Sequence, residues 1–188
     1  MTIEEIFSKL SAHMVKGLMI HDKIAQAYNF LNLKGYKKCH EYHYFSESYN
    51  YKCLQNYYLE QYRKLIPEEK FEEPEIIPAK WYAYSKEDVD TNTKRNAVKE
   101  MMKMWVDWEQ ETKKTLESSY KELYEIGEIC AAKKISKFLA DVDMELKSAR
   151  NKYINLETIG YDITAIVKEQ KDLHKKYEKK IKCIYSKE

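Results

Sequence analysis

The three prolines of this 188-residue chain all fall within one short stretch, at positions 67, 74 and 78. Proline in the interior of a helix kinks or breaks it, and glycine weakens it. The four glycines are scattered, at positions 17, 35, 127 and 160. Long parts of the chain therefore lack helix breakers and are rich in helix-favouring residues such as Lys, Glu, Leu and Ile. The sequence predicts an all-α protein.

Apolar residues recur at helical spacing in five segments of the chain. We expect one domain over residues 1–188, with Gly35 supplying a left-handed turn after the first helix. The five expected helices cover about residues 2–33, 36–66, 93–126, 128–157 and 161–184.

The connection over residues 67–92 is the only long stretch without helical periodicity. The other joins are short, so the first two helices and the next two should form antiparallel hairpins. Helices of ~30 residues are about 45 Å long, whereas about 25 extended residues reach roughly 80 Å. We therefore expect the connection to cross the whole bundle length. This is the topology of ferritin-like bundles, with an additional C-terminal helix here.

Charge and cysteine usage exclude several classes of function. The net charge of +2 gives no global field for nucleic acid, and no run of ~18 apolar residues suggests a membrane span. The scattered glycines form no phosphate-binding loop, so we expect no organic cofactor. The four cysteines form no Cys-x-x-Cys pair, and the N-terminus does not resemble a signal peptide. We expect a reduced, cytoplasmic protein.

Each of the four long helices places an ionisable residue in or beside its apolar stripe, near the middle of the helix. Such charges in a core are costly unless they are paired, so a divalent metal is the most economical explanation. The alternative is that they lie solvated at the rim of each stripe, or share protons in a hydrogen-bonded cluster. The four predicted ligands are His21, Glu47, Glu109 and Glu145.

The chain resembles the ferritin-like superfamily of di-metal carboxylate proteins, which includes ferritins, bacterioferritins and rubrerythrins. The resemblance covers about residues 5–155 and rests on topology and on two segments. These are "LNLKGYKKCHEYHYFSESYNYKCLQNYYLEQYRKL" and "WVDWEQETKKTLESSYKEL". It implies that Glu109 is the third-helix glutamate. It also implies that Glu47 and Glu145 are the bridging glutamates of two Glu-x-x-His motifs, with His21 and Glu109 as terminal ligands.

The chain departs from the family pattern at three positions. His21 stands where the first helix has a glutamate, and Asn50 and Ser148 replace the two histidines of the Glu-x-x-His motifs. His43 and Asp141, one turn before Glu47 and Glu145, are secondary candidates for the missing ligands, as is Asn50 itself. The pattern therefore supports the fold better than the chemistry.

The sequence leaves three functions open. The first is a ferritin-like protein that binds one or two divalent ions, iron or manganese, with ferrous oxidation or oxygen or peroxide chemistry as its activity. The second is a ferritin-like scaffold that has lost its metal centre and acts as an interaction or structural protein. The third is an unrelated helical adaptor that uses its tyrosine-rich second helix and its C-terminal helix. We also expect a homodimer.

Overall fold

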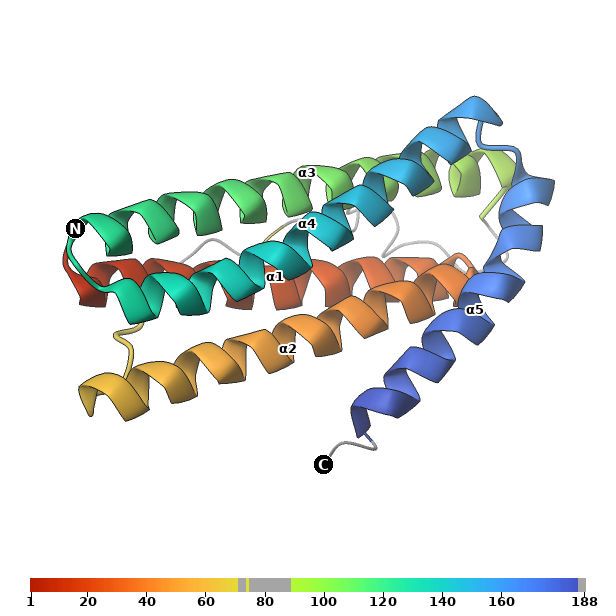
Figure 1. Cartoon of the computed structure of the whole chain (residues 1–188). Coiled ribbons are helices and arrows are strands. Elements are labelled where there is room, and N and C mark those ends of the chain that lie inside the picture. Colours follow the sequence, from red (N-terminus) through yellow and green to blue (C-terminus); the bar gives the residue numbers. More distant parts are fainter. Residues whose placement is uncertain (71–73, 75–88, 186–188) are drawn as a thin grey trace.

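The computed structural model describes residues 1–70, 74 and 89–185, and this part of the chain contains five helices and no strand. Four long helices form a bundle, and the fifth crosses its side (Figure 1). The helices are α1 (Ile3–Phe30), α2 (Lys34–Tyr62), α3 (Thr91–Glu125), α4 (Ile129–Thr158) and α5 (Ile163–Tyr185).

Local sequence signals set most helix ends. The Thr2 side chain accepts a hydrogen bond from the backbone N–H of Glu5, whose carboxylate accepts one from Thr2 N–H in return, which is a capping box. Asp90 caps α3 in a similar way through Thr93 N–H, at 2.6 Å. The turns after α3 and α4 place Gly127 and Gly160 at positive φ, where glycine avoids the steric cost of a Cβ.

The expected role of Gly35 was wrong. The left-handed residue between α1 and α2 is Asn32, at φ 58°, and Gly35 lies inside the first turn of α2. Asparagine tolerates this conformation because its short polar side chain forms local hydrogen bonds. The second helix also ends earlier than expected, at Tyr62, where Arg63 takes a positive φ of 55°.

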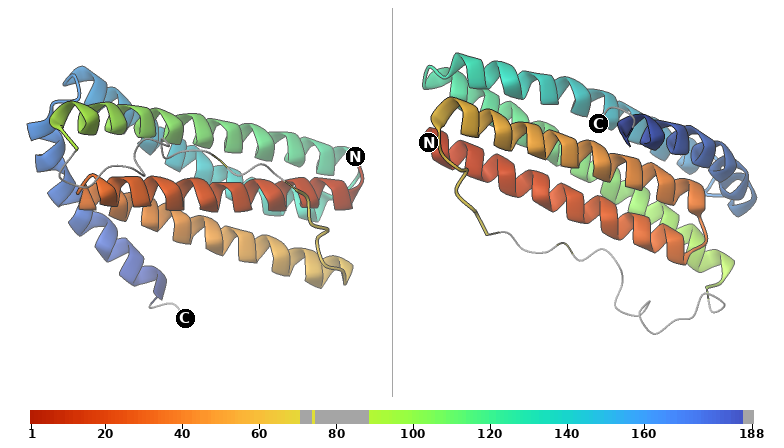
Figure 2. Two further views of the ribbon diagram at one scale, coloured as in Figure 1. Left: turned by 180° about the vertical axis from the view of Figure 1, so that it is seen from behind. Right: turned by 90° about the horizontal axis from the view of Figure 1, so that it is seen from below.

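The bundle consists of two antiparallel hairpins, α1–α2 and α3–α4. The end of α2 and the start of α3 lie at opposite ends of the bundle (Figures 1 and 2), so the connection between them must span its length. Several described residues of that connection contact α1, and two of these contacts are made by prolines. The carbonyl of Pro67 accepts a hydrogen bond from Ser8 Oγ, and the carbonyl of Pro74 accepts one from Lys23 Nζ, both at 2.7 Å. The remainder of the expected crossover, residues 71–73 and 75–88, lies outside the described residues.

Two hydrophobic clusters fill the bundle, one toward each end. One contains Phe7, Leu54 and Leu123, and the other contains Ile24, Trp105 and other apolar residues that extend to α5. The polar side chains discussed below lie in the layer between these clusters. Burial of the apolar side chains in the two clusters stabilises the fold and therefore offsets the free-energy cost of burying the polar side chains between them.

α5 packs along α2 and is fixed there by polar contacts as well as by apolar ones. Tyr36 O–H donates a 2.6 Å hydrogen bond to Glu169, and Lys152 of α4 pairs with the same carboxylate. Tyr177 packs against the rings of Tyr42 and His43. α5 therefore covers α2 beside the polar layer.

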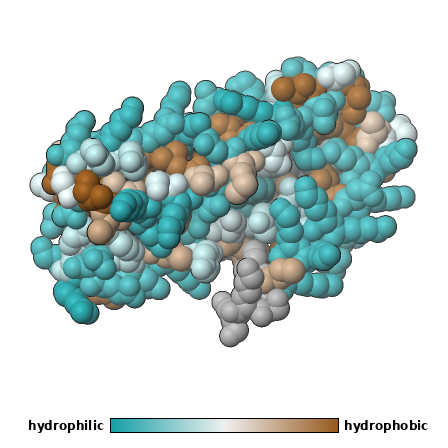
Figure 3. Space-filling view, viewed as in Figure 1, coloured by the Kyte–Doolittle hydropathy of each residue, from teal (hydrophilic) through white to brown (hydrophobic). Residues whose placement is uncertain are grey.

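The face of the molecule seen in Figure 3 is mainly hydrophilic, with scattered apolar side chains. None of the helices in the described part of the chain combines the length and the apolar character that crossing a membrane requires.

Candidate metal centre

Four helices each direct a polar side chain into the layer between the two hydrophobic clusters. His43 of α2 and Glu145 of α4 form an ion pair, with 3.5 Å between Nδ1 and Oε1. Glu109 of α3 is 1% exposed, and ligand atoms of these three residues all lie within 4.8 Å of one another. Two atoms bound to one ion at about 2.0–2.3 Å lie up to roughly 4.6 Å apart. With small side-chain adjustments, this triad can hold one metal ion.

A second group shares Glu109 with the first. Nε2 of His21, on α1, lies 3.6 Å from Oε1 of Glu47 and 3.8 Å from Oε1 of Glu109. His21 is fully buried, and the side chain of Glu47 is 13% exposed. The two groups together provide two imidazoles and three carboxylates. The structure thus brings His21, Glu47, Glu109 and Glu145 into one layer and adds His43.

Two tryptophans of α3 orient two of the carboxylates. Trp105 Nε1–H donates a 2.9 Å hydrogen bond to Glu109, four residues later on the same helix. Trp108 Nε1–H donates a 3.2 Å hydrogen bond to Oε1 of Glu47 on α2. Each carboxylate is held at one oxygen by an indole donor, which restricts its rotation without neutralising its charge.

Gly17 provides the space that Glu47 occupies. A Cβ at this position of α1 would lie 2.2 Å from Oε2 of Glu47 and 2.8 Å from Cζ2 of Trp108. Both distances are far below van der Waals contact, so any side chain larger than hydrogen would displace the carboxylate or the indole. The absence of a side chain at Gly17 is therefore part of the construction of the site.

Several buried donor and acceptor atoms of the layer make no hydrogen bond to any residue that the structure describes. They include Nε2 of His21, both ring nitrogens of His43, and Oε2 of Glu47. Buried polar atoms without partners are rare because each costs about 1–3 kcal/mol. A cation bound between the groups would satisfy these nitrogens and oxygens at once. The residues present therefore fit a divalent metal.

The electrostatics of the layer lead to the same conclusion. Burial, and next the nearby Glu145 carboxylate, raise the pKa of Glu109 well above its usual value. Burial alone would lower the pKa of His43, but the adjacent Glu145 carboxylate raises it well above the ordinary value. Burial would raise the pKa of Glu145, yet His43 lowers it. These shifts show that buried carboxylates in the layer are stabilised by nearby positive charge, which a bound cation would supply.

His40 is a buried residue of the layer that the predicted set of metal ligands left out. Its ring is fully buried, and its Nδ1 lies 3.0 Å from Nδ1 of His21. Burial, followed by the charges of His21 and His43, lowers its pKa well below the usual value. The signal was present, since His40 and His43 are three residues apart and share one face of α2.

The other two secondary candidates stand outside this group of contacts. Asp141 is exposed, one turn before Glu145, and burial followed by the Glu145 charge raises the pKa of its carboxyl. Asn50 is partly buried, one turn after Glu47. Ser148, at the position of the missing family histidine, is also partly buried.

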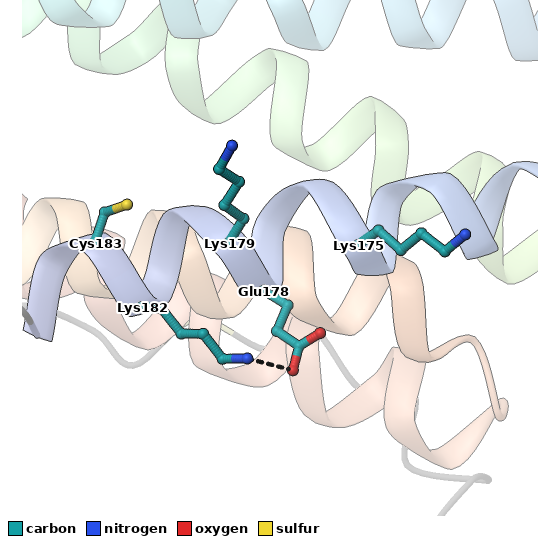
Figure 4. A pocket seen from close by; sticks show the side chains of 5 residues that line it. All are labelled: Lys175, Glu178, Lys179, Lys182 and Cys183. Carbon is teal, nitrogen blue, oxygen red and sulfur yellow. Dashed lines mark ion pairs between the residues drawn. The ribbon is translucent and has the colours of Figure 1, made fainter.

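A shallow pocket on α5 is separate from the metal centre. Its side chains come from one helix, and Lys182 pairs with Glu178 at 3.2 Å (Figure 4). The pocket is lined by Lys175, Glu178, Lys179, Lys182 and Cys183. None of these residues belongs to the buried layer.

The fold has close counterparts among solved structures, although no protein-family model matches the sequence and no curated protein matches it. A closed form of the Archaeoglobus fulgidus ferritin, engineered by mutagenesis, has a TM-score of 0.75 at 15% identity, over 93% of this chain and 96% of that one. A humanized archaeal ferritin has a TM-score of 0.72 at 13% identity, over 91% and 94%. An open-pore ferritin of Archaeoglobus fulgidus has a TM-score of 0.71 at 14% identity, over 90% and 93%. The predicted ferritin-like helical bundle with an extra C-terminal helix is therefore confirmed as the fold.

Proposed function

We propose that this ferritin-like bundle binds one or two divalent ions, iron or manganese, in the layer between its two hydrophobic clusters, and that it oxidises ferrous iron there. The observation that carries the proposal is the triad of His43, Glu109 and Glu145, whose ligand atoms lie within 4.8 Å of one another. The fold supports the same function, since the three structural counterparts are described as ferritins.

The donor set favours a transition metal over calcium or magnesium. Hard cations such as calcium and magnesium prefer oxygen ligands alone, whereas imidazole suits iron and the later transition metals better. The family histidines are missing at positions 50 and 148, but His21 and His43 place two imidazoles in the same layer. Nitrogen ligands are thus available, although they come from α1 and α2.

We propose that Glu109 is the ligand shared by the two metal positions. The resemblance to the family implied that Glu47 and Glu145 bridge the metals, with His21 and Glu109 as terminal ligands. In the present geometry Glu109 lies near His21 and also belongs to the triad with His43 and Glu145. Glu47 and His21 would complete one metal position, and His43 and Glu145 the other.

The protein residues hold, orient and enclose the reacting ions. Bound ferrous ions would supply electrons to dioxygen or peroxide. Trp105 and Trp108 fix one oxygen each of Glu109 and Glu47, and the two hydrophobic clusters flank the layer. Burial and the Glu145 carboxylate raise the pKa of Glu109, and Glu145 raises the pKa of His43; because metal ligands must be unprotonated, binding of a metal should release protons.

Anaerobic calorimetric titration with ferrous iron tests the proposal, together with elemental analysis of protein purified without chelator. We expect the wild type to bind one or two ions per chain and Glu109→Gln to lose most of this binding. Glutamine keeps the acceptor for Trp105 but cannot carry the negative charge. Glu117→Gln, at a half-exposed position of the same helix where the glutamate pairs with Lys113, is the matched control and should bind like the wild type.

Absence of stoichiometric binding in the wild type would reject a metal centre and favour the scaffold function. In that case the layer would be a hydrogen-bonded and ion-paired core, held by contacts such as His43 with Glu145. Equal binding by the wild type and Glu109→Gln would instead place the metal elsewhere on the chain.

We also propose a homodimer in the cytoplasm. Exposed apolar side chains on α2, such as Tyr49 at 65% and Leu59 at 46%, support a contact surface on this helix. Light scattering after size-exclusion chromatography should give twice the 22.6 kDa chain mass. A mass equal to one chain would contradict the dimer.

A further inference from the structure

The pair formed by His21 and His40 is the most unusual hydrogen bond of the buried layer. Both rings are fully buried, and their Nδ1 atoms lie 3.0 Å apart. The remaining nitrogen of each ring, Nε2, makes no hydrogen bond to a described residue. The two Nε2 atoms are not equivalent, however, because that of His21 is 3.6 Å from Glu47 and 3.8 Å from Glu109.

A hydrogen bond between two Nδ1 atoms allows only two arrangements of protons in neutral imidazoles. Either His21 carries a proton on Nδ1 and donates it to His40, or His40 carries the proton and donates it to His21. In the first arrangement Nε2 of His21 has a free lone pair toward the carboxylates. In the second it has a proton there and cannot bind a metal. The direction of this bond therefore decides whether His21 can be a ligand.

The surroundings of His40 hold its ring in a fixed position. The ring contacts Trp105 edge-on, with centroids 5.0 Å apart, and Tyr28, with centroids 5.5 Å apart. His40 also has no carboxylate partner among the described residues, in contrast to His43, which faces Glu145. A buried imidazole without a counter-charge stays neutral, so it can serve as the acceptor.

We propose that His40 is a positioning residue for the metal centre: its Nδ1 accepts the hydrogen bond from His21 Nδ1–H and directs the Nε2 lone pair of His21 between Glu47 and Glu109. This inference rests on the proposed metal binding. Imidazole ligands generally donate their second N–H to an oriented acceptor, and loss of that acceptor typically lowers metal affinity 10–100-fold. An imidazole takes the place of the usual carboxylate or carbonyl acceptor here.

The test uses Zn²⁺, which is redox-inert and diamagnetic, on the full chain. His40→Leu removes the acceptor at similar volume, whereas His40→Asn places Oδ1 near the position of Nδ1. We expect His40→Leu to bind Zn²⁺ about 10–100-fold more weakly in calorimetry, and His40→Asn to recover most of the affinity. His174→Leu, a partly exposed histidine of α5, is the control and should bind like the wild type.

A second readout does not depend on the variants. Long-range ¹H–¹⁵N NMR of the zinc-loaded wild type should show the His21 proton on Nδ1. A proton on Nε2, or equal affinity of wild type and His40→Leu, would overturn the role of His40 and leave metal binding intact. Weakening in both His40 variants without rescue by Asn would also overturn it. A wild type that does not bind Zn²⁺ at all would overturn this inference and the proposed metal centre together.

Discussion

At the scale of single residues, burial decides the chemistry of Glu109 and its neighbours. The Glu109 side chain accepts a hydrogen bond from Trp105 and lies within a few ångströms of two other carboxylates. A second ionised carboxylate in such a place is unfavourable, so either a proton or a cation must be present. The same glutamate on the outer face of α3 would be an ordinary solvated charge.

His13 should make the stability of the protein sensitive to acid. Burial, and next the charges of Lys16 and Lys9, lower the pKa of His13 to about 4. Its Nε2 contacts Thr112 Oγ1 at 2.9 Å, and its ring stacks on Trp108. Because the unfolded chain binds a proton near pH 6.5 and the folded chain only near pH 4, stability is full above pH 6.5 and falls as the pH drops toward 4.

Chemical unfolding of chelator-treated protein at pH 7.5 and 4.5 measures this effect. We expect the loss of unfolding free energy between the two pH values to be about 2–3 kcal/mol smaller in His13→Gln than in the wild type. The difference between pH values is compared because the substitution can change the stability at both. An identical loss in the two proteins would show that His13 is protonated without penalty.

Residue-level reasoning from the sequence selected four of the side chains that the structure places in the polar layer and left out another. His21, Glu47, Glu109 and Glu145 were predicted from their place in four apolar stripes, because a charge in a stripe is visible without knowing the partners of the helix. His40 was not selected, since its role depends on where the ring of His21 lies. That position is set by packing between α1 and α2.

At the scale of helices, Gly17 of α1 allows the side chains of Glu47 and Trp108 to lie close to the α1 backbone. Gly17→Ala would place a methyl group against the Glu47 carboxylate and the Trp108 ring. Alanine stabilises a helix interior by about 1 kcal/mol relative to glycine, and the end of a glutamate side chain moves easily. The buried Trp108 ring must also shift, however, so we expect a loss of about 1–3 kcal/mol in metal-free stability and at least a tenfold loss of ferrous affinity, because the Glu47 carboxylate is displaced.

Gly127→Ala is the contrasting control for this prediction. Nothing lies within 4 Å of a Cβ at Gly127, but its φ of +82° is strained for alanine. This variant should lose about 1–2 kcal/mol of stability and keep its ferrous affinity. Denaturant unfolding measures the stability, and anaerobic calorimetry measures the ferrous affinity. Unchanged affinity in Gly17→Ala would show that Glu47 is not a ligand.

Gly35 has the corresponding role for α5. A Cβ at Gly35 would lie 1.9 Å from the backbone oxygen of Gln170. Because backbone atoms cannot move alone, Gly35→Ala should push α5 away from α2. We expect amide hydrogen exchange to become faster across α5, while protection in α3 and α4 stays as in the wild type. Unchanged exchange in α5 would mean that the helices can separate slightly without loss of contact.

At the scale of the whole molecule, a metal held by four helices should stabilise the entire bundle. A ligand present at 100 times its Kd adds about 2.7 kcal/mol to the free energy of unfolding. For a protein of this size, that corresponds to a rise in Tm of roughly 5–10 °C. We expect ferrous iron under anaerobic conditions to produce this rise in the wild type.

The matched variants for this prediction are His21→Ala and Glu47→Ala. Each removes one proposed ligand of the metal position that His21 and Glu47 form together with Glu109. Their thermal transitions, measured by scanning calorimetry with ferrous iron and with chelator, should differ by less than the wild-type transitions do. A rise as large as in the wild type would mean that neither residue binds the metal.

Local sequence patterns were enough to predict the all-α bundle, its extra C-terminal helix and the reversal of chain direction at each short join. These properties depend on local interactions, namely apolar periodicity, capping residues and the position of helix breakers. The left-handed turn residue was wrongly assigned to Gly35, because asparagine can also adopt this conformation, as Asn32 does.

Which side chains meet, and how they are oriented, became evident only from the packing of the helices against one another. The placement of α5 along α2, the space left by Gly17, the shared position of Glu109 and the pair of His21 with His40 all depend on distances between helices. Such distances result from packing of residues that are far apart in the chain, and no local pattern encodes them.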